Sequence, residues 1–138
     1  PSIVFGSEDQ FFNLFSQISC ISPILPIVGG KTKFQPIYVD DIADACIYFM
    51  NRKTKHSLIN IGTGRDYSIK EYVKLFLKTL IPQKKIKLIF QKNKPNGTPR
   101  KLMDVTLAKN YGWKSKVELK KAIITTYNSY KNNEKYSN

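Results

Sequence analysis

Apolar residues follow two spacings along the chain, and together these predict short strands interleaved with helices. Short runs rich in β-branched and aromatic residues predict strands at residues 2–5, 34–39, 58–61, 86–90 and 102–105. Apolar residues at three- and four-residue spacing predict helices near residues 11–18, 42–50, 69–80, 106–111 and 119–131. This alternation indicates an α/β or α+β fold.

Polar residues predict where the helices begin. A serine followed three residues later by Glu or Gln is typical of a capping box, and the chain has three such pairs: Ser7–Gln10, Ser68–Glu71 and Ser115–Glu118. Asp40 and Asp41 are expected to cap the helix at 42–50. Pro23 and Pro26 are expected to end the first helix and lead into a turn at Gly29-Gly30.

The size and composition fit one folded unit. The chain has 138 residues, of which 41% are apolar, enough for a single domain with a core. No stretch approaches the length of a membrane span, and no signal peptide follows the first residue, Pro1. We expect a piece of a longer protein, with one folded fragment over residues 1–131 and a frayed tail over 132–138.

The formal net charge of +13 has two interpretations. It can attract the phosphates of a nucleotide sugar or of nucleic acid. We favour the alternative that the charge reflects amino-acid composition alone, since the lysines are spread among Asn, Ile and Tyr residues, a mix expected from an AT-rich genome. Without a basic arm or zinc spacing, no specific nucleic-acid binding is expected. Cys20 and Cys46 lie in apolar helical patterns and predict buried free thiols in a reducing compartment.

Several short matches to catalytic motifs have simpler explanations. Gly62-Thr63-Gly64 lacks the third glycine of the dinucleotide fingerprint and predicts a tight turn with positive φ. Tyr127 and Lys131 match the Tyr-x-x-x-Lys pair of short-chain dehydrogenases, but Tyr127 lies on the apolar face of its helix. His56 is predicted at the surface. We therefore assign no catalytic residue and no metal ligand.

The strongest candidate for chemistry is the basic stretch at residues 84–101. Its lysines and Arg100 surround a turn stiffened by Pro95 and Pro99. A rigid turn with Arg100 and Lys101 at its exit can hold a diphosphate, because charge-assisted hydrogen bonds reward fixed geometry. A solvated basic loop explains the same residues equally well on physical grounds.

Four runs carry a resemblance to a known family, residues 39–46, 59–71, 94–105 and 112–114. From about Asp40 onward the chain resembles the C-terminal part of GDP-L-fucose synthases, which belong to the extended short-chain dehydrogenase/reductase (NAD-dependent epimerase/dehydratase) family. The run at 94–105 is specific to these synthases. Residues 1–41 look more like the branch of the complex I 39-kDa-type subunit, because of residues 8–15 and 29–41.

The resemblance implies the C-terminal substrate-binding part of an extended short-chain dehydrogenase, lacking the N-terminal Rossmann half. It implies that Asn96, Arg100 and Lys101 contact a GDP-sugar. The segment Pro1, Ser2, Ile3 and Val4 would touch NADP in the complete enzyme, although this chain alone is not expected to bind it. Phe34 stands where the family has an arginine, Asn96 stands where it has an aspartate, and its epimerisation histidine is missing.

Two functional hypotheses follow. The first is the substrate-binding portion of a GDP-L-fucose synthase-like, NADP-dependent nucleotide-sugar epimerase/reductase that is inactive alone and needs a separate N-terminal Rossmann half. The alternative is a non-catalytic binding or assembly module related to the complex I subunit, or a gene remnant. Under the first hypothesis the partner is a nucleotide sugar, a homodimer is considered, no membrane is involved and the location is cytoplasmic.

Overall fold

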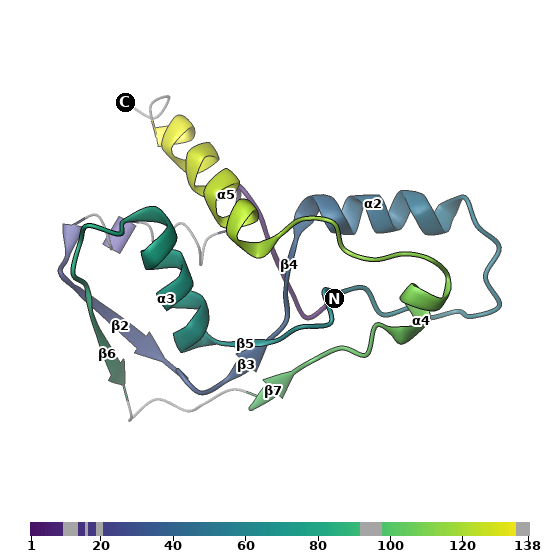
Figure 1. Ribbon diagram of the computed structural model, residues 1–138, viewed down its shortest axis with the longest axis horizontal. Helices are drawn as coiled ribbons and strands as arrows, with labels where there is room; N and C mark the ends of the chain where they lie inside the picture. The colour runs from purple at the N-terminus through teal and green to yellow at the C-terminus, as the bar shows by residue number, and fades with distance from the viewer. Residues whose placement is uncertain (10–13, 16, 19–20, 92–97, 135–138) are drawn as a thin grey trace.

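The computed structural model describes residues 1–9, 14–15, 17–18, 21–91 and 98–134. Half of the helix expected at 11–18 lies outside these residues, as do Gln10 of its capping box and Cys20, whereas residues 14–15 and 17–18 are described and helical. The described elements form an elongated molecule (Figure 1), with strands at one end and two helices at the other.

The strands form three small sheets with parallel and antiparallel pairs. β1 (Ile3–Phe5) pairs parallel with β4 (Pro36–Tyr38). β2 (Ile24–Val28) pairs parallel with β6 (Lys87–Gln91). The third sheet has the order β5-β3-β7, in which β3 (Lys33–Phe34) lies between β5 (Tyr67–Ser68) and β7 (Arg100–Lys101). β3 is antiparallel to β5 and parallel to β7. Segments far apart in sequence therefore meet around β3.

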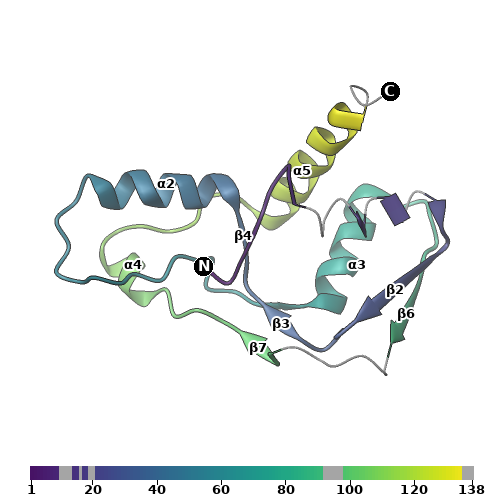
Figure 2. The ribbon, with the colours of Figure 1, turned by 180° about the vertical axis from the view of Figure 1, so that it is seen from behind.

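Four described helices cover these sheets. They are α2 (Val39–Met50), α3 (Ile69–Leu80), α4 (Thr106–Asn110) and α5 (Leu119–Glu134). α3 and α5 enclose an aromatic core with Phe5, Phe34 and Tyr72. α2 and α4 pack around Trp113 at the other end of the molecule, which the reverse view also shows (Figure 2). The site described below is lined in part by Phe5, Phe34 and Tyr72 of the aromatic core.

Three strand predictions were wrong. The Pro23–Pro26 region was expected to lead only to a turn, yet Pro26 lies within β2, opposite Ile89 of β6. Residues 58–61 form no strand, although Ile59 and Ile61 pack partly buried against the α2–α4 core. The strand expected at 102–105 lies earlier, at β7. Whether a segment forms a strand depends on the strand that it pairs with, and sequence periodicity does not contain this information.

Of the predicted helix starts, one capping box was confirmed and another was wrong. The Ser68–Glu71 capping box is confirmed: Ser68 Oγ accepts from Glu71 N at 3.1 Å, and Glu71 Oε2 accepts from Ser68 N at 2.8 Å. The box at Ser115 was wrong, since α5 begins only at Leu119. The prediction of a buried Cys46 was also wrong, because this thiol is exposed.

Asp40 and Asp41 do not cap α2, which corrects that prediction as well. Tyr38 occupies the N-cap position without a side-chain hydrogen bond. Asp41 is buried, and its carboxylate accepts from the backbone N–H of Lys116 at 2.9 Å and of Val117 at 3.2 Å. These bonds tie the first turn of α2 to the segment that leads into α5.

Candidate functional site

Lys101 lies at a cavity shared with the first strand of the chain. The cavity has a volume of about 330 Å³. Its walls come from β1, from residues 32–36, from the start of α3 and from the β7 region: Ile3, Val4, Phe5, Asp9, Thr32, Phe34, Pro36, Ile69, Tyr72, Thr98 and Lys101. The walls are mostly apolar, so Lys101 presents an ammonium group beside a hydrophobic surface. We call this space the β1–β7 cavity.

Arg100 and Lys101 are separated by the geometry of the strand. Neighbouring side chains of a strand point to opposite faces, so both cations of β7 cannot face one cavity. Lys101 lines the β1–β7 cavity, whereas Arg100 Nε donates to Asp66 Oδ2 at 2.5 Å. The hydrogen bond from Arg100 holds the pKa of Asp66 below its ordinary value.

Ser2 fixes β7 beside the first strand. Its hydroxyl donates to the carbonyl oxygen of Lys101 at 2.7 Å and accepts from Gln35 N at 3.3 Å. The fully buried Gln35 also donates from Nε2 to the Met103 carbonyl at 3.4 Å. Ser2 therefore uses its hydroxyl to position Lys101 within the protein.

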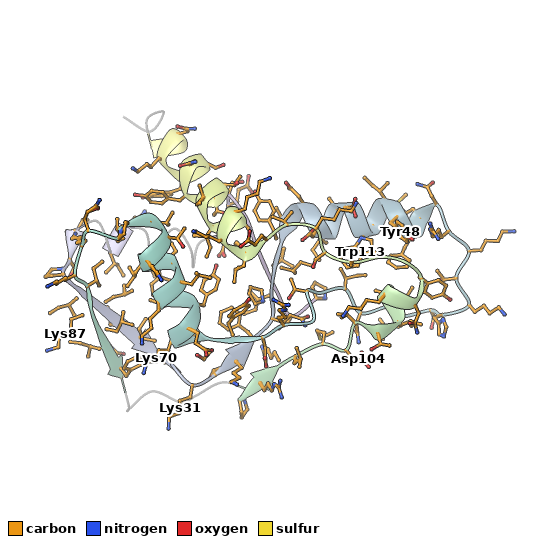
Figure 3. All side chains as sticks on the ribbon, in the orientation of Figure 1. Lys31, Tyr48, Lys70, Lys87, Asp104 and Trp113 are labelled. Carbon is orange, nitrogen blue, oxygen red and sulfur yellow. The ribbon has the colours of Figure 1, made fainter. Side chains whose placement is uncertain are left out.

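A second cavity lies on the other side of the Lys31–Thr32 step. It has a volume of about 420 Å³ and is lined by Ile27, Gly29, Gly30, Lys31, Lys70, Phe90 and Gln91. Lys70 Nζ lies 5.5 Å from the centre of the Phe90 ring, and Figure 3 shows Lys31 and Lys70 near the end of β2. We call it the Phe90 cavity.

The close packing of Gly30 shapes the Phe90 cavity. A Cβ on Gly30 would lie 2.5 Å from a ring atom of Phe90, so only glycine leaves the ring this position. Sequence reasoning predicted the glycine turn but missed Phe90 and Lys70 as possible site residues. The signal that could have found them is an exposed aromatic at the end of a strand that precedes a basic turn.

The remaining predicted site residues are distributed as follows. Asn96 lies outside the described residues, but Gln91 and Thr98 on either side of its segment line the Phe90 and β1–β7 cavities respectively. Pro1 lines a different cavity, beside α2 and residues 54–61. The structure thus brings together Ile3, Val4 and Lys101, and directs Arg100 to Asp66.

The residues set aside in the sequence also have clear environments. His56 is exposed, with Nδ1 at 2.9 Å from the Tyr111 hydroxyl. Lys131 lies over the ring of Tyr127, with Nζ at 4.8 Å from its centre. Gly64 adopts φ +75°, which confirms the tight turn. Within the part of the chain that the structure describes, no cluster of three His, Cys, Asp or Glu side chains could hold a metal.

No family model matches the sequence. Curated relatives include "Probable GDP-L-fucose synthase 1" of Oryza sativa subsp. japonica, 40% identical over 97 residues, which are 70% of this chain and 29% of the relative. "GDP-L-fucose synthase" of Escherichia coli strain K12 is 35% identical over 123 residues, covering 82% of this chain and 38% of the relative. The chain therefore spans only about a third of the length of these relatives.

Solved structures show the same relationship in three dimensions. A GDP-6-OMe-4-keto-L-xylo-heptose reductase from C. jejuni matches with a TM-score of 0.75 and 29% identity, over 94% of this chain and 52% of that one. The NADP-bound GDP-mannoheptose C4 reductase MlghC from Campylobacter jejuni has a TM-score of 0.70 and 33% identity, over 93% and 47%.

The mixed α/β architecture is thus that of part of a sugar-nucleotide-modifying enzyme fold, about half of such a structure. The chain belongs to the extended short-chain dehydrogenase/reductase, or NAD-dependent epimerase/dehydratase, family, and its C-terminal part is homologous to GDP-L-fucose synthases. The suggested likeness of residues 1–41 to the complex I branch stays a prediction. None of the described helices has the length and apolar character needed to cross a membrane.

Proposed function

We propose that this chain forms one wall of a GDP-sugar-binding cleft in an NADP-dependent nucleotide-sugar epimerase/reductase. The observation that carries the proposal is the meeting of Lys101 with Ile3 and Val4 at one cavity. The relatives named above are GDP-L-fucose synthases and GDP-sugar reductases, whose substrates carry a diphosphate. The exposed ammonium group of Lys101 can form a charge-assisted hydrogen bond to such a diphosphate.

The two cavities together suit a long ligand. Their linings include two residues that are neighbours in the sequence, Lys31 in the Phe90 cavity and Thr32 in the β1–β7 cavity. Phe90 and Lys70 offer a planar ring and a cation to the nucleotide portion, and Lys101 offers a cation to the diphosphate. In this proposal Arg100 holds β7 in place through Asp66, and Asn96 keeps its predicted contact with the GDP-sugar.

Of the four residues predicted to touch NADP, only Ile3 and Val4 are placed where they could line a binding space for it. Ile3 and Val4 are each 39% exposed, and β1 pairs with β4 alone among the described strands. One edge of β1 is therefore open to a ligand, whereas Ser2 is engaged within the protein and Pro1 lies at another cavity. NADPH would supply a hydride to the keto sugar. The part of this chain would be to line the binding space at Ile3 and Val4.

We propose that catalysis needs an N-terminal Rossmann half, joined to this chain or supplied separately. The exposed apolar side chains Ile47 and Met50 of α2, at 63% and 83% exposure, suit packing against such a half. Residues 1–131 would then act as one substrate domain. A cytoplasmic location and a homodimer remain predictions for the complete protein.

Calorimetry with GDP, GDP-mannose and NADPH tests the proposal. We expect GDP and GDP-mannose to bind the chain, and Lys101→Ala to lower both affinities by about tenfold, as for loss of a charge-assisted bond. Lys85→Ala removes an exposed lysine outside both cavities and should leave binding unchanged. Failure of every nucleotide to bind at millimolar concentration would overturn the proposal.

A further inference from the structure

A third cavity lies on the other side of Pro36 from the β1–β7 cavity. Among the residues that the structure describes, Pro36 alone lines both. The third cavity has a volume of about 520 Å³ and is formed by the turn before β5, by α3, by α4 and by the segment entering α5. Its lining is Pro36, Thr63, Arg65, Tyr67, Leu75, Lys109, Lys114, Ser115, Val117, Glu118, Leu119 and Lys120.

Four cations surround this cavity: Arg65, Lys109, Lys114 and Lys120. They come from three separate parts of the chain, so the fold itself brings them together. Within the described part of the chain, Glu118 is the one carboxylate that lines it. We call this space the basic pocket.

Asp66 and Asp44 are held by cations outside the pocket lining, Arg100 and Lys116. The pKa of Asp104 is lowered by hydrogen bonds from Thr106 and, to a smaller extent, by the charge of Lys109. Asp66 accepts from Arg100, although it directly follows Arg65. Asp44 accepts from Lys116 Nζ at 2.6 Å and from Trp113 Nε1 at 2.9 Å. Among the described residues, no ion pair joins a carboxylate to any of the four cations of the basic pocket. The pocket therefore keeps a net positive charge that a bound anion can neutralise.

The turn at Gly64 and the apolar residues of the lining indicate which class of ligand the pocket could bind. A Cβ placed on Gly64 would lie 3.5 Å from Lys109 Nζ, so the glycine turn and this ammonium group are close together. Leu75, Val117 and Leu119 supply apolar side chains to the lining, which we call its apolar floor. A cationic rim over an apolar floor suits a ligand with an anionic head and a small apolar body.

We infer that the basic pocket is a second ligand site, separate from the GDP-sugar cleft, and that it binds the phosphate group of a phosphate monoester. Arg65 and Lys109 are the principal phosphate contacts, because one offers a planar fork of donors and the other lies against the Gly64 turn. The apolar floor holds the organic part of the ligand. Inorganic phosphate and pyrophosphate carry the same anionic groups, but they have no organic part that could contact this floor.

Titration calorimetry with phenyl phosphate and with inorganic pyrophosphate, on the full chain, tests the inference. We expect phenyl phosphate to bind, and the double variant Arg65→Gln/Lys109→Gln to lose about tenfold or more in affinity. The matched control Lys85→Gln/Lys87→Gln removes the same charge at the end of the molecule where Figure 3 shows Lys87, and should change affinity less than twofold. Equal losses in both double variants would overturn the inference, since they would show attraction by net charge alone.

Two further measurements distinguish a failure of this inference from a failure of the proposed GDP-sugar cleft. Phenyl phosphate binding should persist in Lys101→Ala, whether or not GDP binds, because that residue does not line the basic pocket. Amide NMR shifts should move at Thr63, Gly64 and Leu119 in the wild-type chain, which needs no variant to fold. Shifts confined to the β1–β7 or Phe90 cavity would contradict the inference. Tighter binding of pyrophosphate than of phenyl phosphate would overturn the assigned monoester class.

Discussion

Arg100 and Asp66 form an ion pair across β3, with Arg100 Nε donating to Asp66 Oδ2 at 2.5 Å. Arg100 begins β7 and Asp66 directly precedes β5, and these two strands flank β3 on opposite sides. The pair therefore links the two outer strands of the third sheet. It also explains why two adjacent cations in the sequence have different surroundings in the structure.

This relationship predicts unequal effects of two adjacent substitutions. Lys101→Gln should lower the affinity for GDP by about tenfold, because it removes the ammonium group at the cavity. Arg100→Gln should lower it by only about twofold, because Arg100 acts through the position of β7. Calorimetry on both variants measures the difference. A larger loss for Arg100→Gln would show that Arg100 itself contacts the nucleotide.

The same ion pair predicts a dependence of stability on pH. The hydrogen bond from Arg100 lowers the pKa of Asp66 relative to the unfolded chain, so the folded state binds its proton less readily. The stabilisation is then complete above the ordinary carboxyl pKa of 3.8 and is lost as pH falls through the lowered value. Asp66→Asn should be less stable than wild type at pH 7, and the difference should shrink toward pH ~2.

Urea unfolding of both proteins from neutral to acidic pH measures this effect. Asp104→Asn is a useful comparison, because the pKa of Asp104 is lowered chiefly by hydrogen bonds from Thr106 and only to a smaller extent by the charge of Lys109. Added salt should therefore reduce the effect of Asp66→Asn more than that of Asp104→Asn. A stability difference that stays constant with pH would contradict the role assigned to the Asp66 carboxylate.

Local sequence signals predicted the parts of the fold that depend on neighbouring residues. The Ser68–Glu71 box and the apolar face of α3 were confirmed, because their hydrogen bonds and packing repeat within one or two helical turns. β2 was missed, since Pro26 in isolation predicts a break. Its partner β6 lies about sixty residues further along the chain, as the pairing of Pro26 with Ile89 shows. No local pattern contains that information.

The sequence also predicted some residues of the candidate site, but not their arrangement in space. The sequence identified Lys101 and the segment of Ile3 and Val4, but it could not place them at one cavity, because β1 and β7 meet only through tertiary packing. It also treated Arg100 and Lys101 as one cationic pair. A strand, unlike a turn, directs neighbouring side chains to opposite faces, and this separates them.

The turn at Gly62 predicts a specific steric effect. A Cβ added there would overlap Oε1 of the fully buried Gln35. This oxygen atom accepts no hydrogen bond among the described residues, whereas Nε2 of the same side chain donates to Met103. Gly62→Ala should therefore lower the free energy of unfolding by about 1–3 kcal/mol. Thermal or urea unfolding measures this. In a double-mutant cycle, Gln35→Ala should relieve part of the loss. Simple additivity would show that the two residues do not interact.

The buried carboxylate of Asp41 allows a test with a matched neighbour. Asp40 and Asp41 both lie in the first turn of α2, but Asp40 is exposed, whereas Asp41 accepts from the N–H groups of Lys116 and Val117. Asp41→Ala leaves both donors without this partner and should lower the free energy of unfolding by about 2–3 kcal/mol. Asp40→Ala removes only a charge near the helix N-terminus and should lower it by about 0.5 kcal/mol.

Hydrogen exchange separates the two effects further. The amide of Val117 should exchange faster in Asp41→Ala than in Asp40→Ala, because only the first substitution removes its acceptor. Asp41→Asn keeps one acceptor oxygen and should fall between Asp41→Ala and wild type in both stability and exchange. Equal destabilisation by Asp40→Ala and Asp41→Ala would mean that both aspartates act only through the charge at the start of α2, and that the link from α2 to the α5 segment carries no stability.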